Sequence, residues 1–299
     1  MKHILFSGLI GLACLAGTTS QAASVQSYAQ ASAGGCGSTS THTDPWSNSG
    51  GAVAAAKATG TSGCDMSSNA GVGAGHVGIT VSGGANAGMD HGSSTGQAVA
   101  RAQYTFNLAT PPGANGPVGM KVNALAHGVV EARQFIASYT ATATASLEAI
   151  LTVSYFDWNL KRERSTDMSA KAEAFATSNS LTRNAVDSQG LDAALTSGWL
   201  TIDPTKEVKV QLHFRGGASY TAHETASGLA AALGGNTLSF APTAFEFDAT
   251  GYSVTDANAS IVNNQWIDPR QSAPAVPLPA PALLLIGGLG ALGALRRRG

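Results

Sequence analysis

Apolar and polar residues alternate along much of the chain, with the period of two that a half-buried β-strand requires. Between Ala98 and Leu108 every second residue is apolar, and the alternation recurs at Val118–Ala124 and over the longer stretch Phe135–Tyr155. A straight strand of that last length would reach roughly 70 Å at about 3.3 Å per residue, too far for one compact domain. We therefore expect Phe135–Tyr155 to bend, or to break into two strands that keep the same phase.

The C-terminal half of the body is expected to add strands of the same kind. Val208–Arg215 and Ala218–Ala226 are predicted to pair as a hairpin, with the chain turning at Gly216–Gly217. Phe245–Val262 supplies the last strands, and Trp266 is expected to close the core.

Two segments in this half also suit a helix. Asp187–Ser197 is the best helix candidate because Leu191 and Leu195 are four residues apart. Ala170–Ala176 alternates like a strand, although an Ala-rich run also favours helix. Parallel α/β folds need helices between their strands, and this chain offers little helix. The pattern predicts a mainly β fold, an antiparallel two-sheet β-sandwich that is jelly-roll-like.

Residues 23–96 differ from the rest of the body because Gly, Ser, Asn and Asp interrupt them every few residues. Ala23–Ala33 alternates weakly and is a candidate first strand. Beyond Gly34 these residue types are typical of turns. We expect this Gly/Ser-rich part to be loop-heavy, with short strands such as Val77–Ser82.

Composition limits the class of protein. Charged residues make up 12% of the 299 residues, about half the usual share, and 36 residues are glycine. Low charge without low hydrophobicity argues against classical disorder. Of 17 basic residues, Lys2 and three arginines lie in terminal segments, which leaves 13 against 18 acidic ones, a net charge of −5. A mildly acidic body without a basic cluster argues against a nucleic-acid partner.

The N-terminus has the features of a secretory signal peptide. Lys2 and His3 precede an apolar run at Ile4–Ala16, and Ser20-Gln21-Ala22 offers small residues for signal peptidase. This predicts a signal helix in residues 1–22, cleaved after Ala22. Cys14 allows a lipoprotein alternative, which the bulky Leu12 and the shortened apolar run disfavour.

After cleavage two cysteines remain, Cys36 and Cys64. Export places them in an oxidising compartment, where they are the minimum for a disulfide. Closing a loop of about 28 residues would contribute roughly 3–4 kcal/mol. Two free thiols are the alternative.

The last 24 residues form three parts in a fixed order. An uncharged apolar run from Ala282 to Leu295 is predicted to enter a bilayer as a C-terminal transmembrane helix, residues 280–295. A Pro-rich motif precedes it: Val276, Pro277, Leu278, Pro279 and Ala280. Three arginines follow it: Arg296, Arg297 and Arg298. The arginines should stay in the cytoplasm and leave the rest of the chain outside.

This tail resembles the VPLPA variant of the PEP-CTERM class of C-terminal sorting signals. The resemblance covers 24 of 299 residues, namely the motif at 276–280, the apolar run and the arginines. The missing Glu of the commoner Pro-Glu-Pro form fits the variant. The resemblance implies a protein of an exopolysaccharide-making Gram-negative bacterium, whose tail is recognised and processed by an exosortase. The Ala/Ser/Thr/Gly-rich body is loosely similar to bodies in this class.

The predicted transmembrane helix suits a temporary role. Its 16 residues span about 24 Å, against a hydrocarbon core of about 30 Å. Its four glycines, at Gly287, Gly288, Gly290 and Gly293, weaken it further. The domain organisation is then a signal peptide at 1–22, a β body at 23–267, a linker at 268–275 and a sorting tail at 276–299.

Short motifs that match enzymes lack the required context. Gly73–Gly78 fits the dinucleotide pattern GxGxxG but leads into a predicted strand instead of a helix. Gly92–Gly96 fits GxSxG around Ser94, but a predicted strand follows where the nucleophile elbow needs a helix. Residues that could complete a triad are His127, His213, His223, Asp203 and Asp248, and nothing selects among them.

No metal site or cofactor is predicted. His76, Asp90 and His91 are scattered in Gly-rich sequence, and Asp256 lacks the spacing of a known calcium motif. Four tryptophans could stack on sugar rings if exposed, although a mostly buried position is commoner. They are Trp46, Trp158, Trp199 and Trp266.

The leading expectation is a non-enzymatic cell-surface or matrix protein associated with exopolysaccharide. It would be held transiently in the inner membrane and then sorted to the surface. A carbohydrate-binding or adhesin module is the second expectation, and a secreted hydrolase the third.

Overall fold

The computed structural model describes residues 25–35, 38–47, 51–59, 64–85, 92–135, 141–178, 184–222 and 227–270. A compact body ends at Ile267, and Asp268 begins a separate unit. The described residues form strands and turns, with no helix among them. All strand pairs between them are antiparallel, so the predicted mainly β, antiparallel fold is confirmed.

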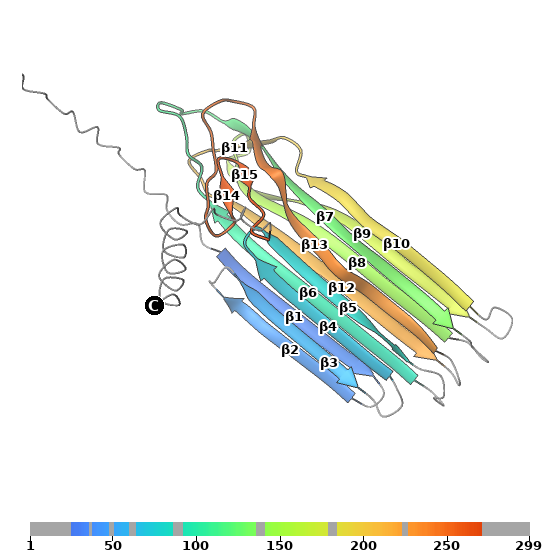
Figure 1. The fold of residues 1–299 in the computed structure, drawn as a ribbon. Coiled ribbons are helices and arrows are strands. Elements are labelled where there is room, and N and C mark those ends of the chain that lie inside the picture. The colour runs from blue at the N-terminus through green and yellow to red at the C-terminus, as the bar shows by residue number, and fades with distance from the viewer. Residues whose placement is uncertain are drawn as a thin grey trace, which may run out of the picture. The chain divides into compact units, whose positions relative to one another are not determined.

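Twelve long strands among the described residues are arranged in two layers (Figure 1). The β12 layer has the order β2 (Ser38–Ser47), β1 (Val25–Gly35), β6 (Gly92–Phe106), β12 (Val208–Ala222), β8 (Ala141–Asp157) and β9 (Arg162–Ser178). The β13 layer has the order β3 (Ala52–Thr59), β4 (Cys64–Gly73), β5 (His76–Ala85), β13 (Ser227–Phe247), β7 (Val118–Phe135) and β10 (Asn184–Thr196).

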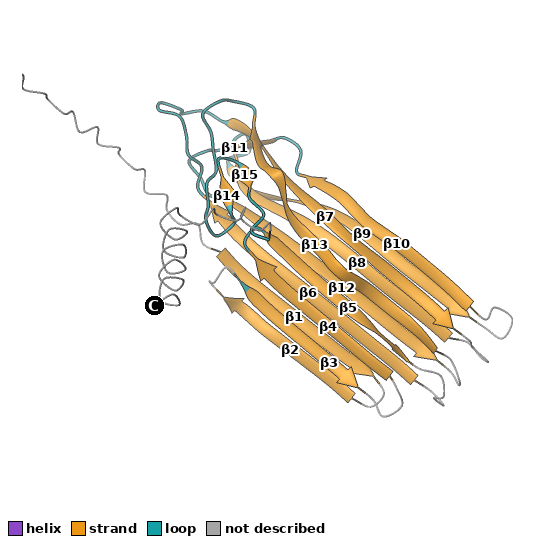
Figure 2. Ribbon diagram, viewed as in Figure 1, coloured by secondary structure: helices purple, strands orange, loops and turns teal. Residues whose placement is uncertain are grey.

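Three short strands lie at one end of this body, where the loops gather (Figure 2). They are β11 (Leu200–Ile202), β14 (Ile261–Val262) and β15 (Gln265–Trp266). Strand β11 pairs with both β7 and β8 and so links the two layers. Strands that are late in sequence lie in the middle, because β12 inserts between β6 and β8 and β13 between β5 and β7.

Inward-facing side chains change in size from one end of the body to the other. At the β11 end, Tyr104, Phe106, Phe240 and Phe245 are buried with ring centroids 5.1–6.1 Å apart. We call this the aromatic end. At the opposite end, the buried inward residues are mostly alanine: Ala98, Ala141, Ala143, Ala145, Ala174, Ala176, Ala230 and Ala232. We call this the alanine end.

Both flanks of the body are closed by side chains instead of backbone pairing. On one flank, Asp187 and Gln189 of β10 accept hydrogen bonds from the backbone N–H groups of Phe175 (2.8 Å) and Glu173 (2.7 Å) in β9. On the other, Asp44 of β2 accepts one from Val53 N–H in β3 at 3.1 Å. An open strand edge is a template for pairing with another chain, and these contacts occupy part of each edge.

Residues 184–196 form a strand, so the predicted helix at Asp187–Ser197 is wrong. Leu191 and Leu195 are both buried, and β10 pairs with β7 along its whole length. A spacing of four residues places two side chains on one face of a strand as well as on one face of a helix. Pairing with β7 makes this segment a strand and not a helix. The Ala170–Ala176 segment is also strand, within β9.

The predicted hairpin turn at Gly216–Gly217 is also wrong, because β12 runs straight through both glycines. A Cβ on Gly216 would lie 2.7 Å from Ile79 Cδ1, in the opposite layer, and 3.0 Å from Leu147 Cδ2. The glycine therefore marks a close approach inside a strand, a role that sequence does not separate from a turn.

The break expected within Phe135–Tyr155 occurs, but its two strands do not share a phase. Strand β7 ends at Phe135 and buries even-numbered residues such as Val130 and Ala132, whereas β8 begins at Ala141 and buries odd-numbered ones. The two strands belong to different layers, on opposite sides of the core. The residues that face the core are therefore even-numbered in β7 and odd-numbered in β8.

The Gly/Ser-rich part at 23–96 contains more strand than expected. It contributes β1 through β5 and the start of β6. Inward positions of β3 are the alanines at 52, 54, 56 and 58, and Val53 between them is exposed. Small inward residues give little hydrophobic contrast, which explains why alternation there is hard to detect in sequence.

Several predicted segments lie outside the described residues: the signal peptide at 1–22, Cys36, the linker from 271 onward and the sorting tail at 276–299 with its arginines. Cys64 begins β4. No helix among the described residues is long and apolar enough to span a membrane.

Candidate functional site

The outward residues of the β12 layer form a mostly polar surface. Cross-strand partners place Gln97, Gly217, Ser146 and Glu173 in one row across β6, β12, β8 and β9. The next row consists of Thr95, Ser219, Thr144 and Phe175. Every second residue of a strand faces the same side, so both rows face away from the core.

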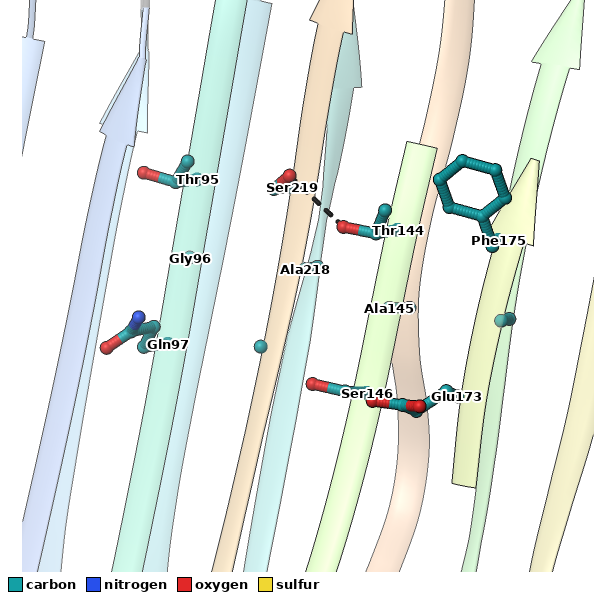
Figure 3. Close-up of a pocket in the computed structure, with 12 residues that line it drawn as sticks. Thr95, Gly96, Gln97, Thr144, Ala145, Ser146, Glu173, Phe175, Ala218 and Ser219 are labelled. Atoms are coloured by element: carbon teal, nitrogen blue, oxygen red, sulfur yellow. Dashed lines mark hydrogen bonds between the residues drawn. The ribbon is translucent and has the colours of Figure 1, made fainter. Parts of the chain in front are cut away.

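A groove of about 410 Å³ crosses these two rows over the backbone of Gly217 and Ala218 (Figure 3). The absence of a large side chain at Gly217 leaves the floor low between neighbouring strands. Thr144 and Ser219 meet across the groove, with their hydroxyl oxygens 3.2 Å apart. The lining thus supplies several hydroxyl groups and the amide of Gln97, which both donate and accept hydrogen bonds.

A second depression of about 380 Å³ continues the groove along the strands and shares Gln97, Ser146 and Gly217 with it. Its border has two ion pairs. Arg215 Nη2 lies 2.5 Å from Glu148 Oε2, and Lys171 Nζ lies 2.5 Å from Glu173 Oε1. The paired charges cancel, so this border does not select strongly for a charged ligand.

Phe175 is the one large apolar side chain in the groove lining. It is 60% exposed, although its neighbours Ala174 and Ala176 are buried. Figure 3 shows its ring beside Thr144 at the edge of the groove. An exposed aromatic ring next to fixed hydroxyl groups can pack against an apolar face of a ligand whose polar groups hydrogen-bond to the rest of the surface.

Sequence reasoning did not identify Phe175 or this groove. The sequence does contain one indication of it. Phe175 stands at an outward position of β9, where most residues are polar, whereas the nearby inward positions hold alanine. The other lining residues are Ser, Thr, Gln and Gly, which are common on any outward strand face. Only the alignment of four strands brings them together.

The residues proposed for a serine hydrolase are not assembled. Ser94 lies within the continuous strand β6 and is buried, so no nucleophile elbow forms. His127 lies on β7, in the other layer, with Nδ1 3.0 Å from Asp192 Oδ1. His213 lies on the outer face of the β12 layer, whereas Ser94 faces inward. His223 lies outside the described residues.

His213 is nearly buried despite its outward position, because Arg101 and Ile150 flank it across the strands. Burial, together with the positive charges of Arg101 and Arg215, lowers the pKa of His213 to about 4. Its Nε2 atom has no hydrogen-bond partner among the described residues. The imidazole is therefore neutral at neutral pH and lies between Arg101 and Ile150 of the neighbouring strands.

The GxGxxG segment at Gly73–Gly78 contains the turn between β4 and β5. Tyr104 grips this turn from the other layer: its hydroxyl donates to Gly73 O and accepts from Gly75 N–H, both at 2.9 Å. Trp266 Nε1 donates to Ala74 O at 3.3 Å. Gly75 has a φ of 72°, and a Cβ there would lie 2.1 Å from the Trp266 indole nitrogen. Glycine is therefore required for structural reasons.

The candidate carboxylates each have a structural role. Asp203 accepts hydrogen bonds from the N–H and hydroxyl of Thr205, and Asp248 accepts one from Gly119 N–H at 2.8 Å. Asp256 is buried and accepts a hydrogen bond from Ala259 N–H at 2.7 Å. Within the described ranges, no group of three or more His, Cys, Asp or Glu residues is arranged to hold a metal ion. Asp90 and His91 lie outside these ranges.

The tryptophans differ in exposure. Trp266 is half-buried and packed against the core, as expected, and Trp158 is half-buried with Lys161 Nζ 3.4 Å from its ring centroid. Trp199 is 55% exposed. The side chain of Trp46 lies outside the described part of the structure. An exposed tryptophan meets one expectation for a sugar-binding surface.

No protein-family model and no curated protein matches the chain. One solved chain matches with 10% identity and a TM-score of 0.12, over 75% of this chain and 86% of that chain. Its description reads "Structural basis for the promiscuous specificity of the carbohydrate-binding modules from the beta-sandwich super family". A TM-score this low does not establish a shared fold.

Proposed function

We propose that this protein is an exported, non-enzymatic surface or matrix protein whose β body binds a neutral polysaccharide along the groove of the β12 layer. The observation that carries the proposal is the groove itself, lined by hydroxyl groups and an amide and bordered by the exposed ring of Phe175. Its scaffold would be a jelly-roll-like sandwich, a finer description that stays a prediction.

The geometry suits an extended sugar chain. Thr95 and Val99 line the two connected depressions from end to end, and four residues of strand span about 13 Å. This is room for a few linked sugar rings. The apolar face of one ring would lie on Phe175, and its hydroxyls would bond to Thr144 or Ser219. The cancelled border charges favour a neutral chain.

The tail motif supports the sorting part of the proposal. Val276–Ala280, the apolar run and the three arginines would direct the protein through the inner membrane to an exosortase, and then to the cell surface or matrix. Replacing Pro277 and Pro279 by Ala tests this by cell fractionation. Unchanged location and unchanged tail length in that variant would refute the sorting role.

The binding part is tested on the full chain in mild detergent, by affinity electrophoresis in gels containing hydroxyethyl cellulose, galactomannan or alginate. We expect retardation by a neutral polysaccharide, and about tenfold weaker binding by Phe175→Ala, equivalent to about 1.4 kcal/mol. Phe175→Trp should retain binding. Val53→Ala, which removes a side chain that is 69% exposed in the other layer, is the matched control.

Binding of no polysaccharide by the wild type would overturn the function of the body. Equal binding by wild type and Phe175→Ala would show that the groove is not the main site of polysaccharide binding.

A further inference from the structure

A second surface with sugar-binding chemistry lies on the outer face of the β13 layer, around Trp199. This residue lies between β10 and β11 and is 55% exposed, whereas a tryptophan is usually mostly buried. Next to it, Leu200 is buried as the first residue of β11. The exposed indole is therefore attached to a fixed part of the body.

Backbone contacts fix this segment against β7. Ser197 N–H donates to Val122 O, and Ser197 Oγ accepts from Val122 N–H, both at 3.0 Å. The preceding residue, Thr196, donates its hydroxyl hydrogen to Asn123 Oδ1 at 2.7 Å. Positioning of an aromatic ring by a rigid element lowers the entropy cost of binding.

A connected set of polar side chains surrounds the ring. Lys121 Nζ lies 4.7 Å from the Trp199 ring centroid and 3.1 Å from Glu246 Oε2. Glu246 Oε1 accepts a hydrogen bond from Asn123 Nδ2 at 2.7 Å. The hydrogen bonds from Asn123 and Lys121 lower the pKa of Glu246, so its carboxylate stays ionised. One positive and one negative charge leave this cluster neutral.

We propose that Trp199, Lys121, Glu246 and Asn123, which we call the Trp199 platform, bind a pyranose ring of a neutral polysaccharide. Trp199 would contact the apolar face of the ring. The ammonium would donate hydrogen bonds to sugar hydroxyls, and the carboxylate would accept them. Asn123 would hold the carboxylate in place, because its Nδ2 donates to Glu246 Oε1 and to Thr243 O at 3.1 Å. A fixed aromatic surface with a few placed polar groups is the usual composition of a small-molecule site.

The platform and the groove occupy opposite outer faces of the body. Lys121 faces outward from β7, since its neighbours Met120 and Val122 are buried in the core, and the groove lies on the outer face of the β12 layer. One sugar chain bound at each face would be joined through the protein. We infer that the body cross-links two polysaccharide chains, a conclusion that rests on the proposed function of the groove.

The platform is tested on its own by ¹⁹F NMR of the full chain labelled with 5-fluorotryptophan, with the Trp199 signal assigned by its loss in Trp199→Phe. Cellohexaose and mannohexaose are the probes. At least one should shift the Trp199 signal in both the wild type and Phe175→Ala. In Lys121→Met the shift should require at least fivefold more sugar. Val53→Ala, on the same layer, is the control.

Cross-linking is tested with galactomannan-coated beads that capture a second, fluorescent galactomannan, after sedimentation has shown which samples are monomeric. Monomeric wild type should bind the beads and capture the second chain. Trp199→Ala should bind the beads but capture at least fivefold less.

The outcomes separate the two proposals. A Trp199 signal that no sugar shifts, while Phe175-dependent binding persists, would overturn the platform and leave the groove in place. Equal capture by the wild type and Trp199→Ala would overturn cross-linking through the platform. No binding to any probe would overturn both proposals.

Discussion

The two ends of the interior solve the packing of two β layers in different ways. At the aromatic end, Tyr104, Phe106, Phe240 and Phe245 fill the space between the layers with rings. At the alanine end, small residues face each other and single large side chains fit against glycine. Tyr220, for example, occupies the space where a Cβ on Gly228 would lie, 2.3 Å from its ring. Truncation of a large buried side chain leaves a cavity, whereas enlargement of a residue in a tight contact forces neighbouring atoms apart.

The largest effect is expected from truncation at the aromatic end. Phe240→Ala would leave a cavity between the layers, because Phe240 is fully buried and contacts three other rings. We expect a loss of about 3–5 kcal/mol in the free energy of unfolding, measured by urea denaturation. Phe175→Ala, on an exposed ring, is the control and should lie within about 0.5 kcal/mol of wild type. A loss below about 1 kcal/mol would show that the aromatic end is loosely packed.

Enlargement at the alanine end should cost somewhat less. In Gly228→Val, the new Cβ would lie 2.3 Å from the Tyr220 ring and 2.7 Å from the backbone oxygen of Arg133, so backbone must move. We expect a loss of about 2–4 kcal/mol by thermal and urea denaturation. Gly217→Ala is the matched control, because its Cβ would meet nothing closer than 3.6 Å. Equal stability of the two variants would contradict a narrow alanine end.

The two ends of the interior each contain a buried tyrosine, and the two hydroxyl groups differ in their hydrogen bonds. The Tyr104 hydroxyl makes two hydrogen bonds to the β4–β5 turn, whereas the Tyr220 hydroxyl has no partner among the described residues. Burial raises the pKa of both, that of Tyr220 to about 12, so both stay neutral.

Removal of the two hydroxyls should therefore differ. We expect Tyr104→Phe to cost about 1–3 kcal/mol, and Tyr220→Phe to be neutral or slightly stabilising. Urea denaturation of both variants gives the comparison. The reverse order would mean that the Tyr220 hydroxyl, and not that of Tyr104, carries the more important contact.

The smallest effect is expected at the flank between β9 and β10. Asp187→Ala frees the N–H of Phe175 and should cost about 0.5–1.5 kcal/mol. It should also increase concentration-dependent association, because part of a strand edge becomes available for pairing. Light scattering measures this association, with the exposed Ser188→Ala on the same strand as control. An unchanged association state in Asp187→Ala would show that the flank is protected by other means.

A strand could be predicted from the sequence where its inward and outward side chains differ clearly in polarity. Strand β6 was predictable because apolar residues from Ala100 to Phe106 alternate with polar ones, and all the even-numbered residues in this range are buried. In β3 the inward residues are alanines, which are no more hydrophobic than the outward Val53, so the alternation is weak in the sequence. For β10, two leucines four residues apart satisfied both helix and strand, and pairing with β7 decided the outcome.

The candidate surfaces were less predictable than the strands. Trp199 could be named from sequence as one of four candidate tryptophans, but its exposure could not, since burial depends on what packs around it. The groove depends on the alignment of Gly217 with Ser146 and Gln97 on neighbouring strands, which are 71 and 120 residues away in the sequence. No local pattern encodes such an alignment.

By itself, the sequence determined the antiparallel β character of the body and the terminal segments that predict its export. Both depend on local properties: a side-chain period of two, and short runs of apolar and charged residues. Only the tertiary structure decided the order of strands, the glycines that allow close approach and the two outer surfaces. These depend on which distant strands pair, because a side chain's neighbours across a sheet come from other parts of the chain.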